Sequence, residues 1–317
     1  MTSFFLMMVL VSAGVGVAAG ALAVPWLADV AMKRAYRRSL SWWNESLQGA
    51  IAYRAGHAGV WPKPSDAGSA GALGMWLDDV KSQAKRKVLT HERACALREA
   101  GIDVGQDCSS RGEREQARRC SFRPTVLQRV VLALACGAWF AALPAFGLPL
   151  QLSVPLSLCG VAMAAGVVCD VRARMIPLEC CGCLLLGGVA FQLLNGGVAG
   201  VVAGFASAAV VLAVCWIANR VARDAGGSVG QGDVRCMTAL AVLSGPASLI
   251  GAASCYIVAG LFSLVGLASR RLKRQDGIPM APCLTLWMIF GTVVAREGSV
   301  RTGRRWCGCL LAIAEHE

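Results

Sequence analysis

Long uncharged runs alternate with short charged joints along most of the chain. Residues 1–28 carry no charged side chain, and three further uncharged runs cover 130–169, 180–219 and 236–269. A last uncharged run covers residues 277–295. About 20 apolar residues are enough to cross the hydrocarbon core of a bilayer. The first and last runs therefore predict one span each, and each middle run is long enough for two.

Turn-forming residues interrupt each of the three middle runs, as expected where a helical hairpin reverses. They are Pro144, Gly147, Pro149 and Pro155 in the first run, Asn195, Gly196 and Gly197 in the second, and Ser244, Gly245 and Pro246 in the third. The pattern thus predicts an all-α membrane protein with about eight transmembrane helices.

The composition agrees with this pattern. The chain is 56% hydrophobic and 16% charged, with a mean hydropathy of +0.56, which excludes an ordinary soluble domain. Most of its 15 cysteines lie in apolar runs, where cysteine behaves as a small hydrophobic residue. Cys180, Cys181 and Cys183 are clustered, but no histidine lies near them in the sequence. We therefore expect no metal site and no cofactor.

The charged joints fix the expected sidedness. Joints separated by complete hairpins return to the same membrane face, and those at 29–129, 170–179, 220–235 and 270–276 contain 27 of the 31 Lys and Arg residues. Positively charged loops favour the cytoplasm, so this face is predicted to be cytoplasmic. Four arginines after residue 295 are the exception.

Four regions follow from these boundaries. They are an N-terminal membrane anchor (1–28), a basic cytoplasmic insertion (29–129), a polytopic membrane domain (130–295) and a C-terminal tail (296–317). Within the insertion we expect a break at 61–68 and one helix from about Leu77 to Ala100, stopped by Gly101. Its basic character favours contact with anionic lipid over binding of nucleic acid.

Two aspartates stand at joints on the predicted cytoplasmic face. Asp170 ends one uncharged run, and Asp233 follows Gly230 and Gly232, which we expect to permit a backbone path closed to other residues. Ionisable groups near bilayer depth are functional candidates, so the pair fits acid–base catalysis or the handling of a proton or cation. Structural aspartates at span ends remain an alternative.

The residues around both aspartates resemble motifs of the type IV prepilin peptidases. Asp170 to Pro177 resembles the first active-site motif, and Gly230 to Asp233 resembles the second, the Gly-x-Gly-Asp (GxGD) element shared with presenilin-type intramembrane aspartyl proteases. Gly277 to Pro282 is similar to a third element. The resemblance covers about 130–295.

This resemblance implies an aspartic endopeptidase of the bacterial inner membrane, active at the cytoplasmic face. Its substrates would be prepilin-like membrane proteins of type IV pilus or type II secretion systems, which lose a basic leader. Asp170 and Asp233 would be catalytic. The supporting motif residues would be Gly230, Gly232, Arg235, Ile176, Pro177 and Pro279, with Pro177 and Pro279 each opening a span in its first helical turn.

The chain also departs from the family pattern. Arg235 stands where the family usually has lysine, and Leu178 where asparagine is common. The insertion lacks paired Cys-x-x-Cys motifs and has only Cys95, Cys108 and Cys120, so N-methyltransferase activity is not expected. A GxGD protease for another class of membrane protein, or a proton- or cation-coupled transporter using the same aspartates, remain the alternative functions.

Overall fold

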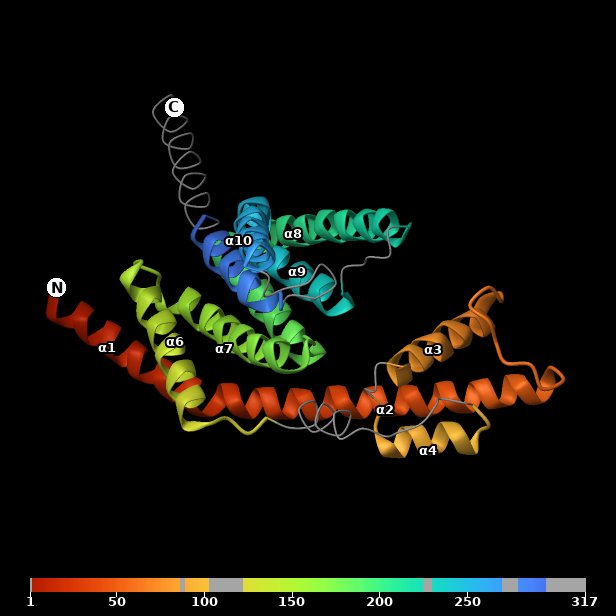
Figure 1. The fold of residues 1–317 in the computed structure, drawn as a ribbon. Helices are drawn as coiled ribbons and strands as arrows, with labels where there is room; N and C mark the ends of the chain where they lie inside the picture. Colours follow the sequence, from red (N-terminus) through yellow and green to blue (C-terminus); the bar gives the residue numbers. More distant parts are fainter. Residues whose placement is uncertain (1, 86–88, 103–121, 225–229, 270–278, 295–317) are drawn as a thin grey trace, which may run out of the picture. The chain divides into compact units, whose positions relative to one another are not determined.

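The computed structural model describes residues 2–85, 89–102, 122–224, 230–269 and 279–294, and the regular structure in these ranges is entirely helical (Figure 1). The chain divides into two compact units. The first comprises Met1–Ala31 and Arg123–Glu317, and the second comprises Met32–Phe122. The predicted tail at 296–317 lies outside the described residues.

The helices of the first unit follow the apolar runs. They are α1 (Thr2–Ala18), the π-helix η1 (Ala19–Ala23), α6 (Val126–Ala145), α7 (Leu150–Ala173), α8 (Leu178–Asp224), α9 (Gln231–Ser244), the short 3₁₀ helix η2 (Gly245–Ala247), α10 (Ser248–Ala268) and a final helix, Ala281–Val294. Helix α2 (Val24–Gly56) begins in this unit and continues into the second, so the helical run does not stop at residue 28.

Helices α6 and α7 form the hairpin expected from residues 130–169. Gly147 adopts a positive φ of 68° in the turn, and the Trp139 indole N–H donates to Leu156 O at 3.2 Å across the pair. Pro155 lies inside α7 and is not part of the turn. Pro149 is the N-cap of α7, and Pro155 lies six residues further along, in the second turn.

A sharp break divides α8 at Gly197, where φ is 60° and ψ is −153°. A Cβ atom on Gly200 would lie 2.7 Å from Gln192 O. Residues eight apart in a straight helix are separated by about 12 Å. The segment after Gly197 therefore folds back on the segment before it, at the predicted turn.

A second break separates α9 from α10 at Gly245, whose φ is 54°. The Tyr256 hydroxyl of α10 donates to Met237 Sδ of α9 at 3.1 Å, so α10 packs back along α9. Five described helical runs are long and apolar enough to cross a membrane, and Ala281–Val294 is shorter. The count of eight spans stays a prediction.

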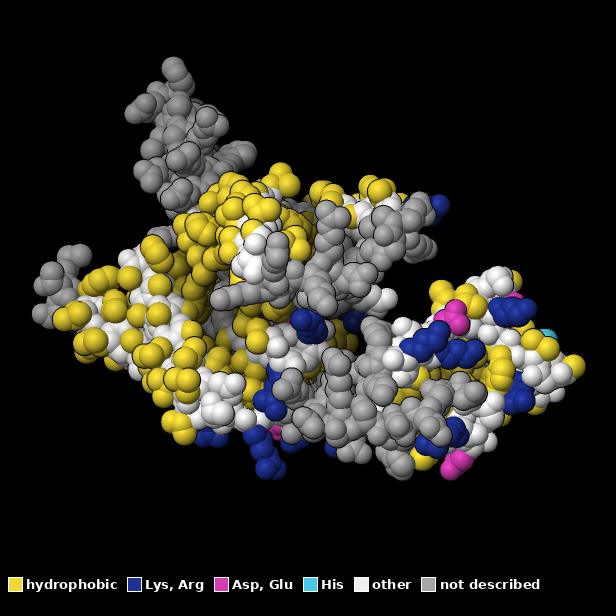
Figure 2. Space-filling view, in the orientation of Figure 1, with side chains coloured by type: hydrophobic (Ala, Val, Ile, Leu, Met, Phe, Trp, Pro, Cys, Tyr) yellow, Lys and Arg dark blue, Asp and Glu magenta, His cyan; other side chains and the backbone are white. Residues whose placement is uncertain are grey.

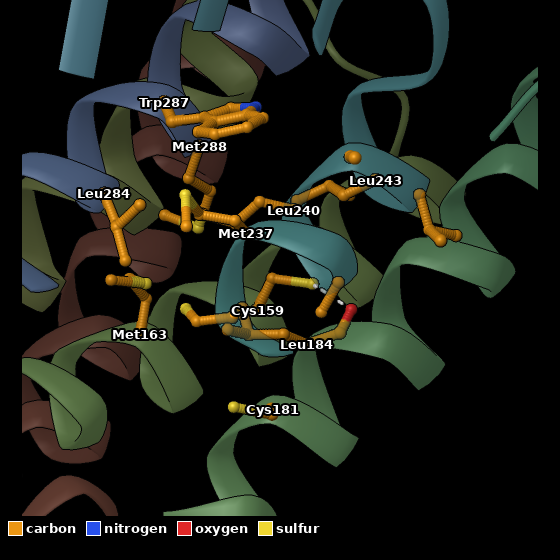
Figure 3. Packing of buried hydrophobic residues seen from close by; sticks show 14 of the residues in the cluster. Cys159, Met163, Cys181, Leu184, Met237, Leu240, Leu243, Leu284, Trp287 and Met288 are labelled. Carbon is orange, nitrogen blue, oxygen red and sulfur yellow. Dashed lines mark hydrogen bonds between the residues drawn. The ribbon is translucent and has the colours of Figure 1, made fainter. Parts of the chain in front are cut away.

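Helix α9 lies in the centre of the first unit's core. Met237, Leu240 and Leu243 are almost completely buried, and Leu284 and Trp287 from the final helix pack in the same cluster (Figure 3). A helix buried on most sides reads as continuously apolar rather than amphipathic. Asp233, in the first turn of this helix, is thus carried by the most enclosed element of the unit.

Gln192 of α8 stabilises the end of α9. Its side-chain Nε2 donates to Leu243 O at 2.7 Å, and the residue is only 5% exposed. Leu243 O is one of the last carbonyls of α9, which have no partner inside the helix. The buried side-chain amide of Gln192 thus donates the hydrogen bond that Leu243 O lacks because α9 ends at Gly245.

Helix α1 and the π-helix η1 approach α6 through one glycine each. A Cβ atom on Gly16 would lie 2.5 Å from Cys136 O, and one on Gly20 would overlap the backbone of Leu132. Small residues four apart let helix backbones pack closely in a membrane. Much of this unit's surface is apolar on the face that Figure 2 shows, and the exposed residues of α10 include Leu249, Ile257 and Phe262.

The second unit has its own hydrophobic core. It contains the rest of α2 with α3 (Gly68–Lys85) and α4 (His91–Glu99), and its core residues include Trp43, Leu47, Trp76, Leu77, Val80 and Leu97. The rings of Trp43 and Trp76 meet edge to face, with centroids 6.0 Å apart.

The prediction of one helix from Leu77 to Ala100 was wrong. Helix α3 begins nine residues earlier, at Gly68, and α4 is a separate helix. Thr90 explains the new start, because its side chain accepts from Arg93 N at 3.4 Å as an N-cap. Gly101, with φ of 77°, ends α4 as expected.

Candidate active site

Asp170 lies in the last turn of α7 and is 6% exposed. The helix ends because Arg174 adopts a left-handed conformation with φ of 51°, and its N–H donates to Asp170 O at 2.8 Å. Left-handed C-terminal caps of this kind turn the chain sharply away from the helix axis. Residues 175–177 then lead, without helical structure, into α8.

Asp233 lies in the first turn of α9 and is half-buried. Its carboxyl is at the helix N-terminus, where unpaired N–H groups and the helix dipole favour a negative charge. Gly232, the residue before Asp233, lies against the backbone of Ile176, six residues after Asp170. The structure thus brings both predicted aspartates to one place.

The expected reason for the two glycines was wrong. Gly230, the N-cap of α9, has φ of −60° and ψ of 139°, a conformation open to every residue, and Gly232 is an ordinary helical residue. Space is what restricts both positions. A Cβ atom on Gly230 would lie 3.0 Å from Asp233 Oδ2, and one on Gly232 would lie 3.4 Å from Ile176 N and O.

This packing joins the first two motifs. Gly232, at the start of α9, lies close to the backbone of Ile176, which is itself buried. Ile176 follows Asp170 by six residues, so the contact fixes the segment between α7 and α8 against the helix that carries Asp233.

The third motif contacts the site through the main chain. The backbone N–H of Ala281 donates to Asp170 Oδ2 at 2.8 Å. Ala281 is the first residue of the final helix. The third motif includes both Pro279 and Ala281, but only Pro279 was expected to support the site. The side chain of alanine has no catalytic group, and a backbone N–H does not distinguish one residue from another. The sequence alone therefore does not identify this donor.

The two motif prolines lie just outside their helices. Pro177 precedes α8, and its carbonyl accepts from Cys181 N at 3.3 Å, which makes it the N-cap rather than a first-turn residue. Pro279 lies two residues before the final helix, and Pro282 is the proline inside the first turn. Pro177 thus lies one residue before its helix and Pro279 two residues before its helix, and neither is in the first helical turn as expected.

Arg235 is exposed on α9, two residues after Asp233. Cys180 and Cys181 are buried at the start of α8, and the described residues contain no group of three or more His, Cys, Asp or Glu side chains that could hold a metal ion. Gly277, Ile278 and Asp276 lie outside the described residues, as does the side chain of Asp224.

One comparison with known proteins bears on this site. The model of the type IV leader peptidase family matches residues 156–267, a range that includes both aspartates but not the segment 277–282. This supports a type IV prepilin peptidase-family assignment and implies a peptidase. Together with the apolar helices, it indicates a multi-pass membrane protein. No curated protein and no solved structure gives a significant match.

Proposed function

We propose that this chain, which carries the type IV leader peptidase match over residues 156–267, is a membrane-embedded aspartic endopeptidase with Asp170 and Asp233 as its catalytic pair. The observation that carries the proposal is the convergence of three separate segments. The Asp170 carboxyl at the end of α7 accepts from Ala281 at the start of the final helix, and the start of α9, which carries Asp233, packs on Ile176 just after Asp170.

Two neighbouring carboxyls suit peptide hydrolysis. One carboxylate takes a proton from a water molecule, which attacks the scissile carbonyl, and the other carboxyl, protonated, donates to the carbonyl oxygen. In this mechanism the two groups share one proton between them, because like charges held close together do not both ionise readily. The resulting titration belongs to the pair and not to either residue.

The proposed substrates are prepilin-like membrane proteins whose basic leader is removed at the cytoplasmic face of the bacterial inner membrane. The resemblance of the first two motifs and the family match support this choice. The proposal does not include N-methylation, because residues 29–129 lack the cysteine pairs of the bifunctional family members. The basic second unit is proposed to contact anionic lipid.

The test is a leader-cleavage assay on matched amounts of membrane-inserted variants. Asp170→Asn and Asp233→Asn should each abolish cleavage, because the amide is nearly isosteric but can neither take nor give the proton. The double variant should be scarcely worse than either single one, since the two residues act as a unit.

Asp224→Asn and Asp276→Asn are the controls, because both aspartates stand in the charged joints and are expected to be solvated loop charges; both variants should keep most of the activity. Substantial turnover by Asp170→Asn or Asp233→Asn would rule out the catalytic pair. It would favour a role of the same aspartates in binding a proton or cation.

A further inference from the structure

We infer that the backbone N–H of Ala281 is a positioning group for Asp170, and that the start of the final helix therefore belongs to the active site. The inference rests on the proposed function, since it concerns the orientation of a catalytic carboxyl. It gives a physical role to Ala281 in the segment 277–282, which lies beyond the family match that ends at residue 267.

The first step is the environment of Asp170. The residue is 6% exposed, at the end of an apolar helix, and a buried carboxyl needs hydrogen-bond donors. Ala281 N lies 2.8 Å from Asp170 Oδ2, a short distance typical of a donor facing a charged acceptor. One oxygen of the carboxyl is thus held in a defined direction.

The second step is the donor. The first N–H groups of a helix have no partner within the helix and point outward along its axis, where the dipole favours negative charge. Ala281 is the first residue of the final helix, and the next turn is already formed, because Leu284 N donates to Met280 O at 3.0 Å. The donor is therefore available without loss of a helical hydrogen bond.

The third step is rigidity. Leu284, Trp287 and Met288 of the final helix are 0%, 1% and 2% exposed and pack into the core around α9 (Figure 3). Because α9 carries Asp233 at its start, the helix that orients Asp170 is packed against the helix that carries Asp233. The packing of these helices and the hydrogen bond from Ala281 thus act together on the position of the Asp170 carboxyl.

The consequence is a defect in turnover rather than in substrate binding when the N–H is removed. Catalytic groups must be held within about 0.5 Å of their productive geometry. The loss of one hydrogen bond to a charged group corresponds to a rate decrease of about tenfold to a hundredfold. We expect this decrease in kcat, with KM changed by less than about twofold because the donor does not contact substrate.

The experiment replaces the Ala281 backbone amide by an ester in the full-length, membrane-inserted chain. Incorporating lactic acid, the α-hydroxy analogue of alanine, at position 281 removes the N–H and keeps the side chain. Ala281→Pro removes the same donor genetically, and proline is tolerated at the first position of a helix.

The matched controls are leucic acid at position 150 and Leu150→Pro. Leu150 is the first residue of α7, at the end opposite to Asp170, and it is exposed. Both controls should keep full kcat. Equal kcat for the unmodified chain and the ester at position 281 would overturn the inference.

A second measurement does not depend on activity. In the full chain, the amide proton of Ala281 should give a downfield NMR resonance that moves upfield in Asp170→Ala. An unchanged resonance would overturn the inference even if the chain cleaves its substrate. If the unmodified chain cleaves no prepilin-like protein, the proposed function fails, and this resonance still decides whether Ala281 orients Asp170.

Discussion

At the scale of single residues, space rather than backbone conformation selects glycine next to the aspartates. A Cβ atom on Gly232 would lie 3.4 Å from Ile176 N and O, a tight but possible contact. We expect Gly232→Ala to lose less than about tenfold in cleavage rate. Gly232→Val should lose at least about a hundredfold, because its γ-carbons would push Asp233 away from its position, and a 1 Å displacement has an effect of that size.

The control for this pair of variants is Gly182→Val in α8. A Cβ atom on Gly182 would meet nothing within 4 Å, so the larger side chain should leave the leader-cleavage rate unchanged. If Gly232→Val cleaves as fast as Gly182→Val, close packing on Ile176 is not what position 232 requires.

The sequence located the candidate aspartates because a carboxyl at the end of an apolar run stands out. It could not identify Ala281, whose contribution is a backbone N–H, nor the reason for Gly230, whose φ turned out to be ordinary. The space available for a Cβ atom at these glycines depends on which segment packs nearby. That information is tertiary, and no local pattern contains it.

At the scale of elements, Gln192 makes the break after α9 possible. Gln192→Leu would leave Leu243 O buried without its donor, which should lower the free energy of unfolding by about 1–3 kcal/mol. The measurement is the unfolding midpoint in detergent. Gln151→Leu, at an exposed position of α7, is the control and should have little effect. Equal midpoints for the two variants would contradict the assigned role.

The sequence predicted the helical hairpins well where turn residues divide an uncharged run, as at Gly147, Gly197 and Gly245. It failed where the pattern gave no such division. The start of α4 depends on the capping bond of Thr90, and the run from Leu77 was interpreted as a single helix because its apolar spacing continued across that cap. Capping is a local contact that periodicity does not detect.

At the scale of the whole molecule, the sidedness of the membrane domain is the main prediction. A reporter active only in the cytoplasm should be active when fused after Arg174, Arg223 or Arg274, since complete hairpins separate these joints. The same reporter fused at Gly196 should be silent, because that residue lies at the far end of a hairpin. A silent fusion at Arg223 would overturn the common face of the two aspartates.

The hydrogen bond between Asp170 and Ala281 also has a consequence for biosynthesis. The two residues are 111 positions apart, so a ribosome adding about 5–20 residues per second makes the acceptor roughly 5 to 20 s before its donor. During that interval the nascent chain holds both aspartates without the group that orients one of them. Under the proposed function, we therefore expect the chain to cleave no neighbouring protein until its final helix has entered the bilayer.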